Sequence, residues 1–419
     1  MSEQFVVRAD DIIEQILIQC WLFQARGGDL VGARRNAERT LERLLAKGLP
    51  HARDSGGLRL DPYAANNMIK ARAGELDDEA WGAWQDTARR NALSLPTEPH
   101  RYRFRMRREW HADCATPGRP LLLRLPVPLR QAQLGSATVR LLEPENVPVE
   151  IRELPGSIGL RLNATHAKKG PVVAELEVDL LGTEHRDTGA AAAPLGAAPS
   201  AQEQLWLRDH EGLVVRSPAV CTLAHTLAQG CADAREFVHA VWRWLISQLR
   251  FGDVHRSDLE PADPLGGLLR SRRADCVLGS SLLVALCRAR GIPARLLSGY
   301  LLHPANPGPH SWAEVRLAAD SWVPFDFGSW CYCAGDPDMP GWGSFYRGRV
   351  DARLIAEIAP REFTGWGSAR PPPRWFRLER LQGDQMVHSL HTLPDGALFR
   401  RDVLDLRIVG PAGPHTPAP

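Results

Sequence analysis

The chain has 419 residues, 44% of them hydrophobic and 24% charged, which is long enough for two or three ordinary soluble domains. Lysine and arginine (51) nearly balance aspartate and glutamate (49), which argues against nucleic acid or a membrane surface as a partner. We expect no secretory signal, no membrane span and a cytoplasmic location, where the eight cysteines stay reduced. The arginine-rich, proline-rich composition is typical of a bacterial protein of high genomic GC content.

Residues 1–97 are predicted to form a helical domain. Apolar side chains recur at helical spacing in residues 13–21, 30–47 and 77–91, and Asp10 is placed to cap the first of these helices. We interpret these stripes as core packing. Because the candidate catalytic residues lie far downstream, we expect this domain to dock a carrier or partner protein and not to take part in the chemistry.

Residues 98–182 change from helical to alternating spacing. Tyr102, Phe104 and Met106 alternate with arginines, which indicates a half-buried strand. Further strands are predicted at residues 121–125, 137–142, 150–154, 159–163 and 172–180. Short strands separated by proline and glycine turns favour a β-sandwich.

The remaining chain divides into three parts. Residues 183–203 are small, uncharged in their centre and broken by prolines, which predicts a linker. Residues 204–370 have the mixed pattern of an α+β catalytic domain. Residues 371–419 are predicted to be a C-terminal extension with a frayed end, and they contain possible strands at residues 375–378, 385–391 and 403–409.

The segment from Asp275 to Pro293 predicts a helix that begins at or just after Cys276. Gly291 suits the left-handed position after the helix, and the proline prevents its continuation. A cysteine at a helix N-terminus gains thiolate character from the helix dipole, and the free N–H groups there can receive an oxyanion. Cys276 is therefore the candidate nucleophile. Cys287, in the middle of the helix among apolar neighbours, is expected to be structural.

Two runs farther along the chain, residues 310–317 and 321–327, predict a β-hairpin. Antiparallel strands pair symmetrically about their turn, so His310 falls opposite Asp326 or within two residues of it. Strands lie roughly 5 Å apart, which lets the imidazole bond the carboxylate. The pattern therefore predicts a nucleophile, a base and an orienting acid. His303 competes as the base, but it lies in a proline-rich loop without this register.

These runs together resemble the core of the transglutaminase-like superfamily. They are Leu-Cys-Arg-Ala-Arg-Gly-Ile-Pro-Ala-Arg at residues 286–295, His-Ser-Trp-Ala-Glu-Val at residues 310–315 and Trp-Val-Pro-Phe-Asp at residues 322–326. Residues 237–251 resemble the helix that precedes the cysteine in these proteins. The sandwich resembles the amino-terminal domain of cytosolic bacterial members, and the likeness covers residues 98–370.

The resemblance implies a papain-like catalytic core, in which the cysteine-bearing helix packs on an antiparallel sheet. It implies Cys276, His310 and Asp326 as the triad, and it implies neither a metal nor an organic cofactor. The backbone N–H of the cysteine would hold the oxyanion, with Gln248 as a candidate side-chain donor. The substrates implied are an acyl donor (an amide or a thioester) and an amine acceptor, as small molecules, peptides or carrier-bound groups.

Two departures from the family pattern lie beside the triad. In the family, glycine usually stands directly before the Asp-Cys pair or replaces its aspartate. Here Arg272-Arg-Ala precedes Asp275. The family often has proline and a small polar residue after the triad aspartate, whereas here Phe327-Gly328 follows. Both departures can alter the acyl or amine pocket.

Three functions stay open from the sequence. The first is acyl transfer to an amine in small-molecule or peptide biosynthesis, which the extra helical domain favours. The second is hydrolysis of cytosolic peptides or amides, and the third is a non-catalytic scaffold. Cys331 and Cys333, near two aspartates, make a metal site conceivable, but no second cysteine pair follows, and we expect a solvent-facing loop there.

Overall fold

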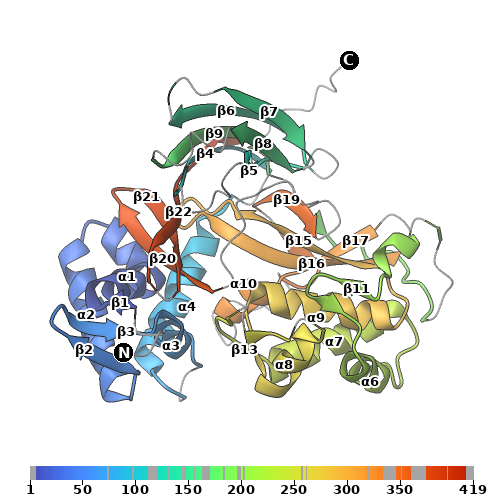
Figure 1. Cartoon of the computed structure of the whole chain (residues 1–419). Helices are drawn as coiled ribbons and strands as arrows, with labels where there is room; N and C mark the ends of the chain where they lie inside the picture. The colour runs from blue at the N-terminus through green and yellow to red at the C-terminus, as the bar shows by residue number, and fades with distance from the viewer. Residues whose placement is uncertain are drawn as a thin grey trace.

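The computed structural model has helices on both sides of a central group of strands (Figure 1). It describes residues 6–72, 75–96, 99–111, 120–129, 133–143, 145, 148–154, 156–162, 170–182, 185–195, 200–201, 203–255, 258–260, 262–318, 321–333, 346–350, 352–359, 374–393 and 395–411. None of the helices formed by these residues is long and apolar enough to cross a membrane.

The amino-terminal part is helical, as its apolar stripes predicted. It contains α1 (Ala9–Arg26), α2 (Leu30–Ala46), α3 (Pro62–Ile69) and α4 (Asp78–Leu93), with a small sheet of β1 (Val7–Arg8), β2 (His51–Asp54) and β3 (Gly57–Leu60). The side chains of Asp29, Asp61 and Asp77 accept backbone N–H bonds at the starts of α2, α3 and α4. The sheet and α3 were not predicted, because such short elements give little periodicity.

A six-stranded antiparallel sheet, in the order β20-β21-β22-β4-β9-β6, joins distant parts of the chain. Its strands are β4 (His100–Trp110), β6 (Gly135–Glu143), β9 (Val172–Leu181), β20 (Trp375–Gln382), β21 (Gln385–Thr392) and β22 (Leu398–Pro411). A second sheet contains β5 (Leu121–Pro126), β8 (Ser157–Leu162) and β7 (Val149–Leu154), and Figure 1 shows it as a neighbouring layer.

The strands expected in the C-terminal extension are present, and they are part of this large sheet. β22 pairs with the whole of β4, from Arg400 opposite Trp110 to Pro411 opposite His100. The extension therefore supplies half of the sheet that also contains the predicted sandwich strands. The end that we expected to be frayed, residues 412–419, lies outside the described residues.

In the catalytic part α9 packs on a four-stranded antiparallel sheet, as the resemblance implied, and three further helices pack against α9. The helices are α6 (Pro218–Leu227), α7 (Ala234–Gln248), α8 (Pro264–Ser271) and α9 (Cys276–Ala289). The sheet has the order β17-β16-β15-β19, with β15 (Ala294–Leu301), β16 (Gly308–Ala318), β17 (Ser321–Phe325) and β19 (Arg353–Ala359). α9 contacts β15 and β16 directly, so the sheet fixes the position of this helix.

Short elements complete the catalytic part. They are β10 (His185–Arg186), the 3-10 helix Glu203–Trp206, β11 (His210–Glu211), β12 (Val214–Val215), β13 (Arg250–Phe251), β14 (Arg273–Ala274), α10 (Phe327–Cys333) and β18 (Arg349–Val350). β10 lies within the predicted linker, residues 183–203, and pairs with β18. The linker is thus partly attached to the catalytic part.

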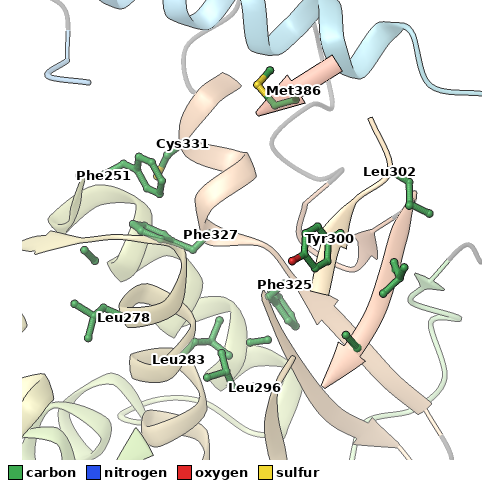
Figure 2. Close-up of a cluster of buried hydrophobic side chains, with 14 of the residues drawn as sticks. Phe251, Leu278, Leu283, Leu296, Tyr300, Leu302, Phe325, Phe327, Cys331 and Met386 are labelled. Carbon is green, nitrogen blue, oxygen red and sulfur yellow. The ribbon is translucent and has the colours of Figure 1, made fainter. Parts of the chain in front are cut away.

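An apolar cluster holds α10 against α9 (Figure 2). The rings of Phe251 and Phe327 lie 6.3 Å apart between their centroids, and both are buried. Gly279 of α9 faces Phe327, and a Cβ added at this glycine would lie 2.3 Å from the phenyl ring. Only glycine therefore allows α10 to pack this closely on the helix that carries Cys276.

The amino-terminal helices pack against the catalytic part, a contact that their apolar stripes alone did not predict. Lys70 forms a 2.9 Å ion pair with Asp253, and Asn66 donates a 3.0 Å hydrogen bond to the same carboxylate. Trp84 of α4 stacks on Phe251, with 6.0 Å between ring centroids. Periodicity could not reveal this, because an apolar stripe shows that a face is buried but not what buries it.

Candidate active site

Cys276 is the first residue of α9, as the sequence predicted. The side chain of Asp275 caps the helix by accepting a 2.9 Å hydrogen bond from the N–H of Leu278. Two residues earlier, β14 pairs with β13 and ties the lead-in to the end of α7. Arg272, in the place where the family pattern departs, takes a left-handed conformation with φ of 58°. These contacts present the thiol at the positive end of the helix dipole, half-exposed.

The hairpin brings His310 and Asp326 together, in the register that the sequence predicted. Val315 of β16 pairs with Val323 of β17, and Ala313 pairs with Phe325. Nε2 of His310 lies 2.9 Å from both carboxylate oxygens of Asp326. The side chain of Cys276 lies beside the same imidazole and contributes to its raised pKa. The three residues therefore form one continuous chain of contacts.

The pKa values of this buried pair favour a charged imidazole. Burial alone lowers the pKa of His310, but the Asp326 carboxylate and then the Cys276 side chain outweigh it and raise the pKa to about 9. Burial also opposes ionisation of Asp326, yet His310 and Arg353 hold the pKa of its carboxyl well below the usual range. At neutral pH the site is thus arranged to hold an imidazolium beside the Asp326 carboxylate.

Arg353 and Ser329 also hold Asp326, and sequence reasoning missed both. Nη2 of Arg353 donates a 2.8 Å hydrogen bond to Oδ2, and the hydroxyl of Ser329 donates one of the same length. The N–H of Ser329 donates to Oδ1 at 2.9 Å. The one sequence signal for the arginine is its charge at the start of β19, a strand with one other charged residue, Glu357.

His303 is part of the same buried network and does not act as the base. Nη1 of Arg353 donates to Nε2 of His303 at 3.2 Å, and Nδ1 of the ring lies 3.2 Å from the amide nitrogen of Asn91. Burial, and then Arg353 and His310, hold the pKa of His303 well below its usual range, so the ring is neutral. A neutral ring that accepts at Nε2 donates at Nδ1, and the Asn91 amide accepts this proton when it is turned so that its oxygen, otherwise buried without a hydrogen-bond partner among the described residues, takes the place of its nitrogen.

Gly328 makes room for the contact between Cys276 and His310. A Cβ added at this glycine would lie 2.9 Å from Cβ of the cysteine and 2.9 Å from Cε1 of the histidine. Both distances are shorter than real Cβ contacts allow. The Phe-Gly pair that departs from the family pattern is therefore fitted to the narrow space beside the thiol.

Two predictions about nearby residues are corrected. Gln248 is exposed at the end of α7, its amide contacts Ser247 at 3.5 Å, and it does not line the cavity that holds Cys276, so it is not placed to bind an oxyanion. Cys331 lies in α10 and is buried, not in a solvent-facing loop, and burial raises the pKa of its thiol. The described residues contain no cluster of side chains that could hold a metal ion, and the side chain of Cys333 lies outside them.

Cys276 and His310 open onto a cavity of about 800 Å³. Its walls come from the amino-terminal helices, the strands β4 and β5, the catalytic sheet and the C-terminal strands. Many of the lining side chains are aromatic: Tyr63, Trp84, Trp110, Phe251, Tyr300, Trp375 and Phe376. The volume lies in the range of sites for small organic ligands, roughly 300–1,000 Å³.

A helix-borne cysteine that faces a histidine–carboxylate pair on an antiparallel sheet defines a fold of the thiol-protease type. Residues 222–327 match the family model of the transglutaminase-like superfamily. This segment, which contains Cys276, His310 and Asp326, belongs to that superfamily.

Solved structures with some likeness to the chain come from several bacteria. A candidate cysteine protease from Cytophaga hutchinsonii has 13% identity and a TM-score of 0.47, over 77% of this chain and 94% of that one. The periplasmic domain of TgpA from Pseudomonas aeruginosa has 16% identity and a TM-score of 0.28, over 57% and 91%. No curated protein matches the chain significantly.

Proposed function

We propose that the protein is a cysteine-dependent acyltransferase that forms an amide bond through an acyl-enzyme thioester. The observation that carries this proposal is the contact chain from Cys276 through His310 to Asp326, with the cysteine at the start of α9. Such a chain supplies a thiolate, a proton carrier and a fixed imidazole orientation.

The first half of the reaction forms the thioester. The sulfur of Cys276 attacks the acyl carbon of an amide or thioester donor, and the negative charge that develops on the carbonyl oxygen lies near the free N–H groups at the start of α9. The bond to the leaving group then breaks, and the imidazolium of His310 gives its proton to that group. Asp326 keeps the ring in place and stabilises its charged form.

The second half transfers the acyl group. An amine enters the cavity and attacks the thioester carbon, the bond to sulfur breaks, and His310 accepts the proton of the amine. Water in the place of the amine gives a carboxylic acid instead, so hydrolysis is the alternative outcome of the same intermediate. The aromatic side chains in the cavity walls support transfer to an amine, because they offer apolar surface on which an organic acceptor can bind. A cytoplasmic location is part of this proposal.

Product partitioning tests the proposal. The protein is incubated with a short acyl thioester and a series of primary amines, and products are measured by mass spectrometry beside a Cys276→Ala control. We expect the amide fraction to rise with amine concentration and an acyl adduct to appear on Cys276. Free acid alone at every amine concentration would make the protein a hydrolase. If the wild-type protein forms no more product than the Cys276→Ala control, the non-catalytic scaffold is supported.

A further inference from the structure

The C-terminal strands form one wall of the cavity, and two rows of side chains cross this wall. All of these side chains but Leu390 are polar or charged. Residues paired across antiparallel strands point to the same face of a sheet. Arg377 of β20 pairs with Leu390, which pairs with Arg400 of β22. The next row on this face runs through Glu379, His388, Asp402 and Arg108. Both arginines of the first row, and Arg108, line the cavity that holds Cys276.

Arg108 forms an ion pair with the carboxylate of Asp402. Its Nε and Nη2 lie 2.6 Å and 2.8 Å from the two carboxylate oxygens, and both residues are buried. Arg400 reaches the same carboxylate only at 3.5 Å, and 29% of its side-chain surface is exposed. One carboxylate thus faces two arginines, and the first arginine holds it in a two-bond geometry.

The side chain of Arg377 makes no hydrogen bond or ion pair with any residue in the described part of the chain, although it is half-buried. It lies two strands from Arg400, roughly 10 Å between Cα atoms, which two arginine side chains can bridge by converging on one group. Burial and then the neighbouring Arg108 lower the pKa of Arg400, and Arg377 adds a smaller contribution in the same direction.

The nearby carboxylates do not neutralise the wall. Asp253 is paired with Lys70 at 2.9 Å. Glu379 accepts a 3.4 Å hydrogen bond from Gln15 and lies 3.6 Å from His388, whose pKa burial lowers, so the ring is neutral. Five arginine and lysine side chains line the cavity: Lys70, Arg108, Arg124, Arg377 and Arg400. They face the carboxylates of Asp253, Asp275 and Glu379 in the lining, and that of Asp402, which is bound to Arg108. Glu357 also lines the cavity, but burial raises its pKa to about 8, so it is largely uncharged at neutral pH.

We propose that Arg377 and Arg400 form a binding subsite for an anionic group, a carboxylate or a phosphate, on a substrate whose reactive carbonyl or amine lies at Cys276. This inference rests on the proposed function, because it assigns a substrate class to the same cavity. Guanidinium groups match such anions through paired N–H donors, and a partly enclosed site strengthens the attraction. The subsite lies in residues 371–419, outside the segment that matches the superfamily model.

Alkylation of Cys276 by matched probes tests the subsite. The probes are N-(carboxyalkyl) iodoacetamides of increasing chain length, their uncharged primary amides, and the corresponding alkyl phosphonates. We expect one chain length at which an anionic probe labels Cys276 about tenfold faster than its neutral partner. This ratio should fall to near one in Arg377→Gln and in the Arg377→Gln/Arg400→Gln double variant. The carboxylate and phosphonate series distinguish the two anions.

The matched control is Arg380→Gln, which removes an arginine from the same strand. Arg380 is exposed and bonds Asp11 outside the cavity, so the ratio should stay at the wild-type value. Equal labelling by charged and neutral probes at every length in the wild-type protein would overturn the subsite, even if plain iodoacetamide labels Cys276 normally. Failure of plain iodoacetamide to label Cys276 would instead count against the proposed function.

A second measurement does not depend on alkylation. Calorimetric titration of the Cys276→Ala protein with glutarate and with its neutral analogue glutaramide compares an anion with an uncharged isostere. We expect glutarate to bind at least about tenfold more tightly and Arg377→Gln to remove the difference. Two results together would overturn the subsite. The first is that glutarate and glutaramide bind with equal affinity, and the second is that the wild-type and Arg377→Gln proteins bind inorganic phosphate equally.

Discussion

Arg353 donates a 2.8 Å hydrogen bond to Asp326, the same carboxylate that holds His310, and both partners of this ion pair are buried. The arginine comes from β19, an edge strand of the catalytic sheet, and its other nitrogen contacts His303. Through Asn91 this network reaches α4. The orientation of the imidazole thus depends on parts of the chain that lie on both sides of the superfamily segment.

Arg353→Met should lower acyl transfer by tenfold or more and destabilise the fold by about 3–5 kcal/mol, because it leaves a buried carboxylate with one cation fewer. The pH at which His310 loses its proton should rise, since Asp326 then interacts with a single cation. The measurement is the pH profile of Cys276 alkylation beside a thermal melt. Arg353→Lys, which keeps the charge, should restore part of the activity and part of the stability. An unchanged pH profile of alkylation in Arg353→Met would show that the arginine does not influence His310.

Cys276 should react with iodoacetamide at pH 6 faster than Cys221, although Cys221 is exposed and Cys276 only half-exposed. The helix start and the imidazolium of His310 favour the thiolate, and the thiolate is the reacting species. Cys287 should not label, because burial raises the pKa of its thiol. Peptide mass spectrometry gives the three rates. Faster labelling of Cys221 or Cys287 would contradict the assignment of the nucleophile. The Cys276→Ala variant should lose turnover while its thermal melt stays unchanged.

The stability of the protein should fall between pH 6.5 and 9 in a way that depends on His310. Its pKa in the folded state is about 9, above the ordinary value of 6.5, so the folded protein keeps a proton that the unfolded chain releases. This stabilisation is complete below pH 6.5 and is lost as the pH rises through 9. We expect the difference in Tm between the wild type and His310→Asn to shrink over this window. A constant difference would mean that the two states bind this proton equally.

Gly328→Ala should reduce transfer by about a hundredfold and cost about 1–3 kcal/mol of stability, because the new methyl group separates Cys276 from His310. Gly82→Ala is the matched control. A Cβ at Gly82 meets no atom within 4 Å, and alanine is favoured in the helix α4, so this variant should be as active as the wild type and slightly more stable. Full activity of Gly328→Ala would show that the space beside the thiol is not limiting.

Deletion of residues 1–97 should give insoluble protein or protein without Cys276 reactivity. The deletion removes Lys70, the buried partner of Asp253, and Trp84, which stacks on Phe251, so it exposes an apolar face of the catalytic part. Expression, a thermal melt and iodoacetamide labelling measure the outcome. A soluble truncated protein with a cooperative melt and normal labelling would instead favour the docking module that the sequence alone predicted.

The sequence by itself determined the parts of the site that depend on local structure. The helix that begins at Cys276 follows from the segment that Gly291 and Pro293 terminate, and the contact between His310 and Asp326 follows from the symmetry of one hairpin. Both inferences span few residues, so neither needed the rest of the fold. Gln248, by contrast, was placed by its closeness in sequence, and the turn of α7 directs it to solvent.

Only the tertiary structure decided what surrounds these residues. Arg108 and Asp402 are 294 positions apart in the chain, and they meet because β22 pairs with β4. The contact of Arg353 with Asp326 and the reach of Asn91 into the same network likewise come from strand order and helix packing. A periodic pattern specifies which face of an element is buried, but its partner across the core is chosen by the packing of the whole chain.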